Sequence, residues 1–239
     1  MGLRQHLYGI SSILNVGNSN MNCFRYKVQH DYGFAPNPFH GYLTLAACKG
    51  QIRGNPHLQI GDWIVGLGSC AMGNEGHIIY AMKVEERLTF DQYWADRRFR
   101  CKKPVLNGSL VQMYGDNVYH HNPGVEGYVQ EPCAHSNNDG TVNEGHLCRD
   151  TRCENVLISR TFYYFGDACP PIPDEFAYIN VDYRNYAYMD LTGCDEEINA
   201  FVNWLEEEYG QGIHGDPCNW REFNLPPITL PNLNNDEEA

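Results

Sequence analysis

A ten-residue run from Val156 to Phe165 constrains the fold of this chain more than any other segment, because β-branched and aromatic residues dominate it. Residues of these two kinds favour the pleated, half-buried surface of a sheet, so the run predicts a buried strand. Runs of similar character lie at residues 24–30, 63–68 and 77–86, and turns rich in glycine separate them. The chain is therefore expected to build a sheet from segments that are far apart in the sequence.

Two other segments carry helical signals. In residues 195–209, four apolar side chains recur at the spacing i, i+3, i+4 and i+7, which places them on one helical face. They are Ile198, Phe201, Val202 and Leu205. Acidic residues open this segment, where they complement the helix dipole, and Gly210 follows as a terminator. Thr89 is a suitable N-cap for a second helix in residues 90–99. Strands and helices together predict the α+β class.

The length of 239 residues suits one large domain. We expect this domain over residues 1–191, with an acidic C-terminal helix and tail over residues 192–239 packed on it. Residues 105–153 are rich in Gly, Asn, His and Cys and have little periodicity, which predicts a long irregular insertion. A loop of this length is usually functional or held in place by something.

The net charge of -13 is unevenly distributed. From Asp195 to the end there are 11 acids and one base, whereas the stretch from Lys83 to Lys103 holds seven bases and four acids. A near-neutral body with a local basic patch suits a compact anionic ligand better than extended duplex DNA alone.

No apolar stretch approaches the length of about 20 residues that spans a bilayer, and the N-terminal residues lack a signal-peptide pattern. We therefore expect a cytoplasmic protein without a membrane partner. Its ten cysteines are then expected to be mostly reduced. The sequence leaves open whether the chain forms a homo-oligomer.

The first half of the chain contains the residue types that a base-binding pocket needs. Such a pocket requires an aromatic wall, amide or carboxylate groups for the base edge, and fixed cations for phosphate. The candidates are Asp31, Tyr32, Asn37, Phe39, Lys49, Arg53 and Ser69. The alternative is that the aromatic residues belong to the core and that Gly66 and Gly68 serve sheet packing.

A basic run from Asp96 to Lys103 extends this set. Its candidate phosphate contacts are Arg97, Lys102 and Lys103, and Trp94 just before it adds an aromatic surface. The alternative, equally compatible with the sequence, is a solvated helix end that balances the acidic C-terminal helix.

The insertion contains residues that could hold zinc, the one cofactor that the sequence suggests. They are Cys133, His135, His146, Cys148 and Cys153. Sulfur and imidazole ligands at short separations suit tetrahedral zinc, which would tie down the long loop. The spacings are not those of a standard zinc knuckle, so a loop with ordinary thiols and surface histidines is the alternative.

Several linked motifs resemble the nucleotide modification associated domain 2 family. They are HDYGFAPNPFHGYLTLAACKGQIR, GDWIVGLGS, IIYAMKVEERLTFDQYWADRRF, CKKP and NVLISRTFYYFGDACPPIP, and they extend from about Tyr26 to Pro173. The resemblance implies a context of DNA-base modification in a prokaryotic or phage-infected cell, without specifying a reaction. Gly50 stands where proline is expected after the Cys-Lys pair, which questions the stiffness of that turn.

The order of parts also resembles the PUA-like group, which includes readers of modified bases. The corresponding parts are Arg53, Gly61-Asp62, Trp63 to Gly68, Ile78 to Glu85, and Asp96. This topological resemblance implies a small mixed or antiparallel β-barrel with flanking helices, which binds a base in an aromatic pocket.

Three functions fit these observations. The first is a module that binds a small nucleotide or a flipped modified base, including one that sequesters a nucleotide signal in phage defence. The second is a nucleotide-modifying enzyme that uses Asp31 or Glu85 as general acid or base, with Cys48 beside Lys49 as a candidate nucleophile. A buried structural role for Cys48 is the alternative. The third is a structural subunit of a modification complex that docks through the acidic helix.

Overall fold

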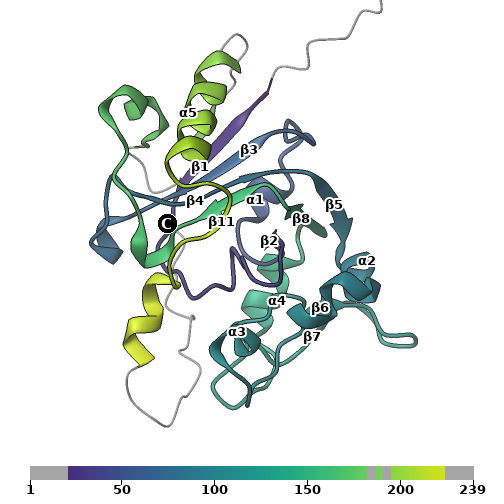
Figure 1. The fold of residues 1–239 in the computed structure, drawn as a ribbon. Coiled ribbons are helices and arrows are strands. Elements are labelled where there is room, and N and C mark those ends of the chain that lie inside the picture. Colours follow the sequence, from purple (N-terminus) through teal and green to yellow (C-terminus); the bar gives the residue numbers. More distant parts are fainter. Residues whose placement is uncertain (1–20, 182–186, 190–194, 224–239) are drawn as a thin grey trace, which may run out of the picture.

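The computed structural model describes residues 21–181, 187–189 and 195–223, and it forms three sheets with helices around them (Figure 1). The end of the expected C-terminal tail, residues 224–239, lies outside the described residues. The largest sheet has six strands in the order β10-β1-β3-β4-β9-β11. Its strands are β1 (Cys23–Lys27), β3 (Trp63–Leu67), β4 (Ile78–Lys83), β9 (Phe162–Tyr164), β10 (Ala187–Met189) and β11 (Gly212–Ile213). The pairs β1–β3 and β9–β11 are parallel and the other pairs are antiparallel, so the sheet is mixed.

Two smaller antiparallel sheets complete the described strands. One has the order β2-β8-β5, and the other pairs β6 with β7. The bounds are β2 (Leu43–Leu45), β5 (Glu86–Thr89), β8 (Asn155–Ser159), β6 (Tyr119–His120) and β7 (Val129–Gln130). The α+β class is therefore confirmed. The sheets are open, and the described strands do not close into the small barrel that we expected.

The run from Val156 to Phe165 forms two strands and not the single strand that we expected. This division explains why the sheets are open. The run breaks at Arg160 and Thr161, so that β8 joins the second sheet and β9 joins the large one. The Glu85 carboxylate accepts hydrogen bonds from both backbone N–H groups at this break and from the Thr161 hydroxyl, at 2.9 Å. Because β4 and β5 also separate at Val84 and Glu85, the two sheets diverge at one corner.

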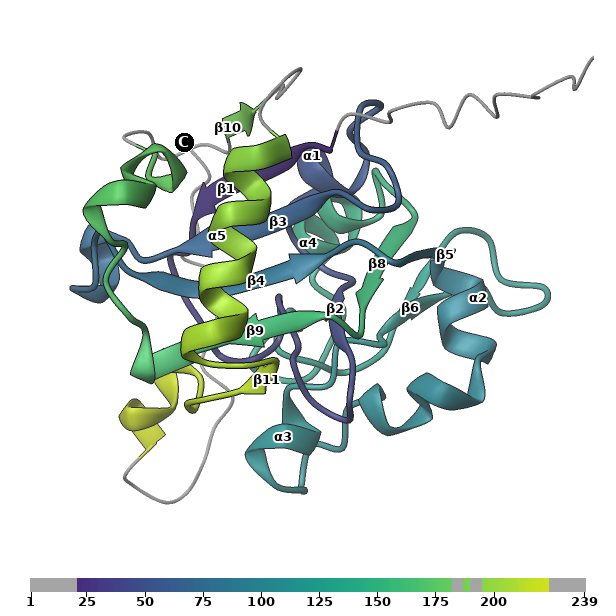
Figure 2. The same ribbon diagram turned by 45° about the horizontal axis from the view of Figure 1, so that its top comes forward.

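Helix α5 (Asp195–Glu208) lies across one face of the large sheet (Figure 2). The other α-helices are short: α1 (Gly50–Arg53), α2 (Phe90–Ala95), α3 (Leu110–Met113) and α4 (Glu144–Asp150). The 3₁₀ helices are η1 (Cys70–Met72), η2 (Arg97–Lys102), η3 (Gly166–Ala168), η4 (Asp174–Ile179) and η5 (Cys218–Phe223). Thr89 caps α2 as expected, and it forms a capping box with Gln92. None of the helices in the described parts of the chain has the length and apolarity needed to traverse a bilayer.

The core has layers on both faces of the large sheet. Side chains alternate along β3, so Trp63 and Val65 face α5 whereas Ile64 packs on the opposite side. Ile198, Phe201 and Leu205 of α5 are buried in this layer, and Val202, the fourth residue that the helical spacing indicated, is partly buried and packs against it.

The insertion at residues 105–153 is more ordered than its composition indicates. It contains α3, α4 and the β6–β7 pair. Its side chains Tyr119 and Cys133 are buried in the same cluster as Phe90 and Tyr93 of α2, and the Tyr119 ring packs edge-on to Phe90. The insertion therefore forms a third core on the side of the molecule that carries the second sheet.

The position of Phe201 gives a test of how α5 is held. Its side chain is 1% exposed and packs in the layer between α5 and the large sheet. We expect Phe201→Ala to lower the free energy of unfolding by about 3–5 kcal/mol, because it removes apolar contacts and leaves a cavity. Glu207→Ala, on the exposed side of the same helix, should change it by less than about 0.5 kcal/mol. Chemical denaturation measures both, and equal effects would contradict the packing of α5 described above.

Candidate functional site

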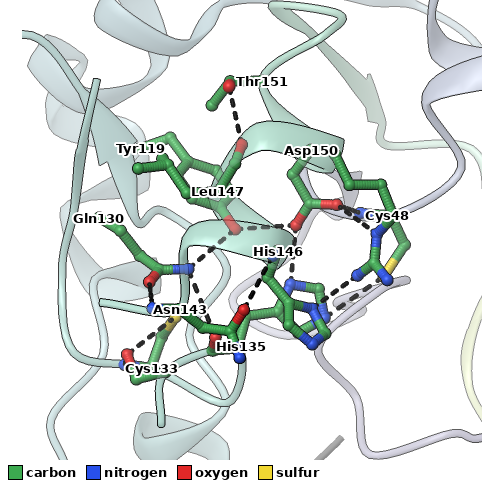
Figure 3. A network of polar contacts seen from close by, with 12 residues as sticks. Cys48, Tyr119, Gln130, Cys133, His135, Asn143, His146, Leu147, Asp150 and Thr151 are labelled. Carbon is green, nitrogen blue, oxygen red and sulfur yellow. Dashed lines mark hydrogen bonds and ion pairs between the residues drawn. The ribbon is translucent and has the colours of Figure 1, made fainter. Parts of the chain in front are cut away.

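Three side chains from distant parts of the chain form a connected row: Cys48, His135 and Asp150 (Figure 3). The sulfur of Cys48 lies 3.4 Å from Nε2 of His135, and Nδ1 of His135 lies 2.7 Å from Oδ2 of Asp150. A thiol, an imidazole and a carboxylate in this order are the arrangement that activates a cysteine nucleophile, in which the carboxylate orients the imidazole.

The backbone at Cys48 is in an unusual conformation. The chain leaves β2, and Cys48 and Lys49 then adopt φ angles of 52° and 41° before α1 begins at Gly50. A non-glycine residue with positive φ costs roughly 1–3 kcal/mol and persists only where its surroundings impose it. Here the Cys48 N–H donates to Oδ1 of Asp150, at 3.1 Å, and the Cys48 carbonyl accepts from Nε of Arg53, at 2.8 Å. The contacts to Asp150 and Arg53 therefore hold this turn in its left-handed conformation.

Arg53 connects the segments around the site. Its guanidinium is fully buried and donates to four backbone carbonyls, at 2.6–2.8 Å. These belong to Cys48, Cys153, Asn155 and Asp150. The sequence indicated Arg53 as a phosphate contact, but in this structure its N–H groups donate to carbonyls and thereby hold Cys48 and Asp150 together.

Asp150 lies at the end of α4, and a chain of hydrogen bonds fixes it. The Tyr119 hydroxyl donates to Oδ2 of Asp150, at 2.8 Å, and in turn accepts from Nε2 of Gln130, at 3.2 Å. Oε1 of Gln130 accepts from the backbone of Asn143, which caps the start of α4. The insertion thus supplies two members of the row and the residues that support them.

The charges of the row favour a protonated imidazole. Burial would lower the pKa of His135, but the Cys48 sulfur and the Asp150 carboxylate raise it to about 10. Burial opposes ionisation of Asp150, but His135, Arg149 and Tyr119 outweigh it and hold the pKa of that carboxyl well below its usual range. With both ring N–H groups present, His135 donates to Asp150 on one side and to the sulfur on the other.

Access differs along the row. The side chains of His135 and Asp150 are both 1% exposed, whereas Cys48 is partly exposed. The His135 ring packs edge-on to Phe34 and lies 4.3 Å from the His146 ring. Of the three residues, Cys48 is therefore the one that solvent reaches, whereas His135 and Asp150 are shielded from water.

The same three residues are also the set in the described chain that could hold a metal ion, since their ligand atoms lie within 4.8 Å of one another. The contacts favour a hydrogen-bonded row instead. Asp150 contacts the ring nitrogen that faces away from Cys48, and its two oxygens already accept from Cys48 N, His135 and Tyr119. A metal held between sulfur and carboxylate would have to replace these bonds.

The five residues indicated for zinc do not all lie in this set, which contains His135 alone among them. The His146 ring packs against the His135 ring at a tilt of 43°, and its Nδ1 accepts from Arg149, at 2.6 Å. Cys133 is buried, Cys148 is exposed and Cys153 is partly exposed. Zinc at these five residues stays a prediction.

The residues indicated for a nucleotide pocket are distributed over several places. Asp31 is buried and accepts from the Tyr164 hydroxyl, at 2.7 Å, and from the backbone N–H of Cys218, at 3.1 Å. Tyr32 stacks on Tyr114, and Phe39 stacks on Trp220. These three residues of the loop therefore contact the C-terminal segment and the insertion.

Asn37 and Lys102 form a separate buried pair. Nζ of Lys102 donates to Oδ1 and to the carbonyl of Asn37, at 2.5 and 3.0 Å, and to the carbonyl of Tyr42, at 2.9 Å. Burial lowers the pKa of Lys102 to about 8. This lysine joins the loop to η2 inside the protein.

Trp94 and Lys103 lie at the surface and line a shallow pocket of about 170 Å³. Its other walls are Pro104, Leu106, Glu131 and Pro132. Nζ of Lys103 lies 3.1 Å from the centre of the Trp94 ring, whose other neighbour is the stacked ring of His120. Arg97 is exposed nearby on η2.

Lys49, Ser69 and Glu85 take three different positions. Nζ of Lys49 lies 4.9 Å from the centre of the Tyr26 ring, beside Cys48. Ser69 is buried after β3, and its N–H donates to Oδ1 of Asn74, at 3.0 Å. Glu85 braces the corner between the sheets.

The two glycines of the proposed pocket serve packing. A Cβ at position 66 would lie 2.2 Å from the Tyr80 ring, and one at position 68 would lie 1.9 Å from a backbone oxygen, so both positions require glycine.

The sequence indicated Cys48 as a candidate nucleophile and His135 as a candidate zinc ligand, without connecting the two. It gave no indication of Asp150, Tyr119 or Gln130. The Cys48–Asp150 contact joins residues 102 positions apart. Residue spacing shows only ligands that are close in sequence, so it could not indicate this convergence. The one local signal was an unusually long insertion rich in polar residues.

The four carbonyl contacts of Arg53 generate a test. In Arg53→Lys, one ammonium group cannot reach all four acceptors, so we expect the free energy of unfolding to fall by about 3 kcal/mol or more. The control is Arg87→Lys, because Arg87 is exposed and its guanidinium donates to the carbonyl of Leu58. It should cost less than about 1 kcal/mol. Urea denaturation compares the two, and an Arg53 variant as stable as its control would contradict the structural role.

The protonation of His135 predicts a dependence of stability on pH. Because its pKa is raised from 6.5 to about 10 on folding, it contributes stability below pH 6.5 that is lost as the pH rises toward 10. Lys102 acts in the opposite sense, since its lowered pKa adds stability as the pH rises above about 8. The measurement is therefore the difference in the free energy of unfolding between wild type and His135→Gln, which should shrink from pH 6.5 to pH 10. A constant difference would rule out a protonated His135.

A model of the nucleotide modification associated domain 2 family matches residues 20–224, which is most of the chain and includes all three members of the row. Searches among curated proteins and among solved structures found no match. The family match agrees with the motifs in the sequence and extends beyond them at both ends. The chain therefore belongs to the nucleotide modification associated domain 2 family.

Proposed function

We propose that this protein is an enzyme that uses the thiol of Cys48 to attack a nucleotide or a nucleobase. The observation that carries the proposal is the row in which Asp150 contacts Nδ1 of His135, and Nε2 of His135 contacts the Cys48 sulfur. Family membership supplies the context of nucleotide modification. Because the substrate is a nucleotide, we place this activity in the cytoplasm of a prokaryotic or phage-infected cell.

The step that this arrangement supports is addition to an electrophilic sp² carbon of the base or of a group attached to it. The Cys48 thiolate forms the S–C bond, and the π electron pair of the attacked bond moves to the neighbouring nitrogen or oxygen. That atom takes the proton from Nε2 of His135. Collapse of this adduct re-forms the π bond and expels the leaving group of that carbon together with the proton. Water then adds to the same carbon and gives a proton to His135, and collapse of the second adduct releases the Cys48 thiolate.

Asp150 serves this step without exchanging a proton. Its contact to Nδ1 holds the His135 ring with Nε2 toward the sulfur and stabilises the imidazolium. Its contact to the Cys48 N–H places the backbone of the nucleophile. Asp31 and Glu85, which the sequence suggested as acid or base, take no part in this scheme because their carboxylates bind Tyr164 and the sheet corner.

A second candidate function is binding without catalysis. The surface pocket at Trp94 and Lys103 favours it, because it combines an indole, a cation and apolar walls that suit a small nucleotide or a flipped modified base. Under this proposal the protein would capture a nucleotide signal during phage infection. Calorimetry with Trp94→Ala and with Cys48→Ala separates the candidates, because only the binding function requires Trp94.

The enzyme proposal predicts an unusually reactive thiol. At pH 7, iodoacetamide is expected to modify Cys48 about tenfold faster than Cys101 or Cys148, which are exposed and lie outside the row. His135→Gln should remove this advantage, because the imidazolium no longer stabilises the thiolate. Peptide mass spectrometry resolves the sites. Cys48 that reacts no faster than the two exposed thiols would overturn the proposal.

Product analysis with a panel of nucleotides and modified bases completes the test. Conversion that is lost in Cys48→Ala, while calorimetry still detects binding, supports catalysis. Intact ligand recovered after tight binding supports the second candidate. Metal analysis of protein purified without chelator is a further check, since about one equivalent of zinc bound through Cys48 would contradict the thiol function and less than about 0.1 equivalent would agree with it.

A further inference from the structure

Two partly exposed cysteines that the proposed mechanism does not use lie where the end of the large sheet meets the C-terminal segment. Cys169 follows η3, Cys218 begins η5, and both are free thiols. Cysteines so far apart in the sequence can react with each other only if the fold aligns the segments that carry them. The contacts between the two segments show that it does.

The segments run parallel in a constant register. In the β9–β11 pair, Tyr163 opposes Gly212, and each partner lies 49 positions further along the chain (Figure 2). The same offset holds beyond the strands, where the N–H of Asp167 donates to the carbonyl of Asp216, at 2.8 Å, and the N–H of Asp216 donates to Oδ1 of Asp167, at 3.0 Å. Two residues further along each segment, the same offset places the two cysteines opposite each other.

The segments also approach each other closely. A Cβ at Gly166 would lie 2.1 Å from the carbonyl oxygen of Asp216, so no side chain fits between the backbones there. Beyond the cysteines, the guanidinium of Arg221 binds the Asp167 carboxylate, at 2.7 Å. Contacts on both sides of Cys218 therefore hold its segment against η3.

The side chain of Asn74 locates both sulfurs. Its Nδ2 lies 3.8 Å from the sulfur of Cys169 and 3.8 Å from the sulfur of Cys218, so the sulfurs are no further apart than twice this distance. Opposed residues of neighbouring strands have Cα atoms roughly 4.8 Å apart, which lies inside the range of about 4.4–6.8 Å that disulfides span. Side-chain rotation is then enough to bring the two sulfurs together.

Cys218 opens a segment that holds the loop after β1. Its N–H donates to Oδ2 of Asp31, at 3.1 Å, and the N–H of Asn219 donates to the Asp31 carbonyl, at 2.9 Å. Nε1 of Trp220 donates to the carbonyl of Tyr32, at 2.9 Å. A bond at Cys218 would therefore restrain η5 and this loop together.

We infer that Cys169 and Cys218 are a redox-sensitive pair, whose disulfide links η5 and the loop that it holds covalently to the end of the large sheet. The loop also reaches the row, because the Phe34 ring packs edge-on to His135. The inference goes beyond the proposed function and does not depend on it, since neither cysteine takes part in the reaction at Cys48.

Hydrogen peroxide is the oxidant of this step. One thiol loses its proton, its sulfur bonds to a peroxide oxygen, and the O–O bond breaks, which gives a sulfenic acid and, after protonation of the leaving hydroxide, water. The second thiol loses its proton, and its sulfur attacks the sulfenic sulfur and displaces hydroxide, which leaves as a second water. Two thiols are thus oxidised to one disulfide while one peroxide is reduced to two waters.

The surroundings keep the pair reduced under ordinary conditions. Burial raises the pKa of both thiols, and the Asp31 carboxylate raises that of Cys218 further. Both groups therefore stay protonated near neutral pH and react slowly with oxidants. Disulfides of cytosolic proteins are usually transient and serve catalysis or redox sensing. The pair is suited to close under sustained oxidation and to reopen under reducing conditions.

Peroxide oxidation followed by peptide mapping tests the pair. The Cys48→Ala variant serves as the background, so that the proposed nucleophile does not consume the oxidant. After oxidation, the remaining thiols are blocked with iodoacetamide and unreduced peptides are analysed by mass spectrometry. We expect the peptides of Cys169 and Cys218 to be joined, with two hydrogens fewer than the separate peptides contain. Two alkylated cysteines after prolonged oxidation, or links from either one to other cysteines, overturn the inference.

Matched variants check the assignment. Cys169→Ser and Cys218→Ser should each abolish the link, and urea denaturation of the reduced proteins verifies that both variants fold. Cys70→Ser removes an exposed thiol from η1 and should leave the link as it is in the background protein.

Amide hydrogen exchange measures the restraint. In the oxidised protein the N–H groups of Cys218 and Asn219 should exchange at least about tenfold more slowly than in the reduced protein, because the link opposes local opening of η5. The N–H of Phe99, which donates to the Asp96 carbonyl in η2, should exchange as before. Dithiothreitol should restore the faster exchange in η5. A link that leaves the exchange in η5 unchanged contradicts the restraint.

Discussion

The guanidinium of Arg53 is the contact on which the arrangement of the site depends. It gathers the carbonyls of Cys48, Asp150, Cys153 and Asn155, which belong to three segments of the chain: the turn after β2, the end of α4 and the approach to β8. Each carbonyl has its own N–H donor in a planar, rigid group, so the distances between the segments are set together. One guanidinium therefore positions the backbones of both Cys48 and Asp150, although 102 positions separate these residues in the sequence.

The divergence of the two larger sheets creates the position in which Arg53 binds its four carbonyls. Because β4 passes into β5 and β8 into β9 at one corner, the second sheet turns away from the large one and offers the insertion a surface to pack on. Tyr119 and Cys133 are buried in that contact, and His135 follows directly. The insertion is thus part of the structure that builds the site, which explains why so irregular a segment contains buried polar residues such as Gln130 and Asp150.

Local signals in the sequence predicted individual helices correctly. The division of the strands between sheets and the composition of the site depend on tertiary contacts, which local signals do not show. Thr89 and the apolar spacing of Ile198, Phe201 and Leu205 indicated their helices, because capping and amphipathicity act within a few residues. The break between β8 and β9 depends on a carboxylate 76 positions away, which no local pattern shows. The same limit applies to the site. Arg53 and Lys102 looked like phosphate contacts because a cation in a sequence does not reveal whether carbonyls will bury it.

The energetics of the row argue that it exists for chemistry. Two consecutive residues with positive φ cost roughly 1–3 kcal/mol each, and a buried ionic pair often contributes no more to stability than well-packed apolar residues would. A fold under selection for stability alone has little reason to retain this combination beside a partly exposed thiol. The proposed reaction gives a reason, because an imidazolium that is shielded from water and oriented by a carboxylate is suited to activate a thiol beside it. The left-handed conformation at Cys48 and Lys49 then accompanies two contacts, one from the Cys48 sulfur to Nε2 of His135 and one from the Lys49 ammonium to the face of the Tyr26 ring.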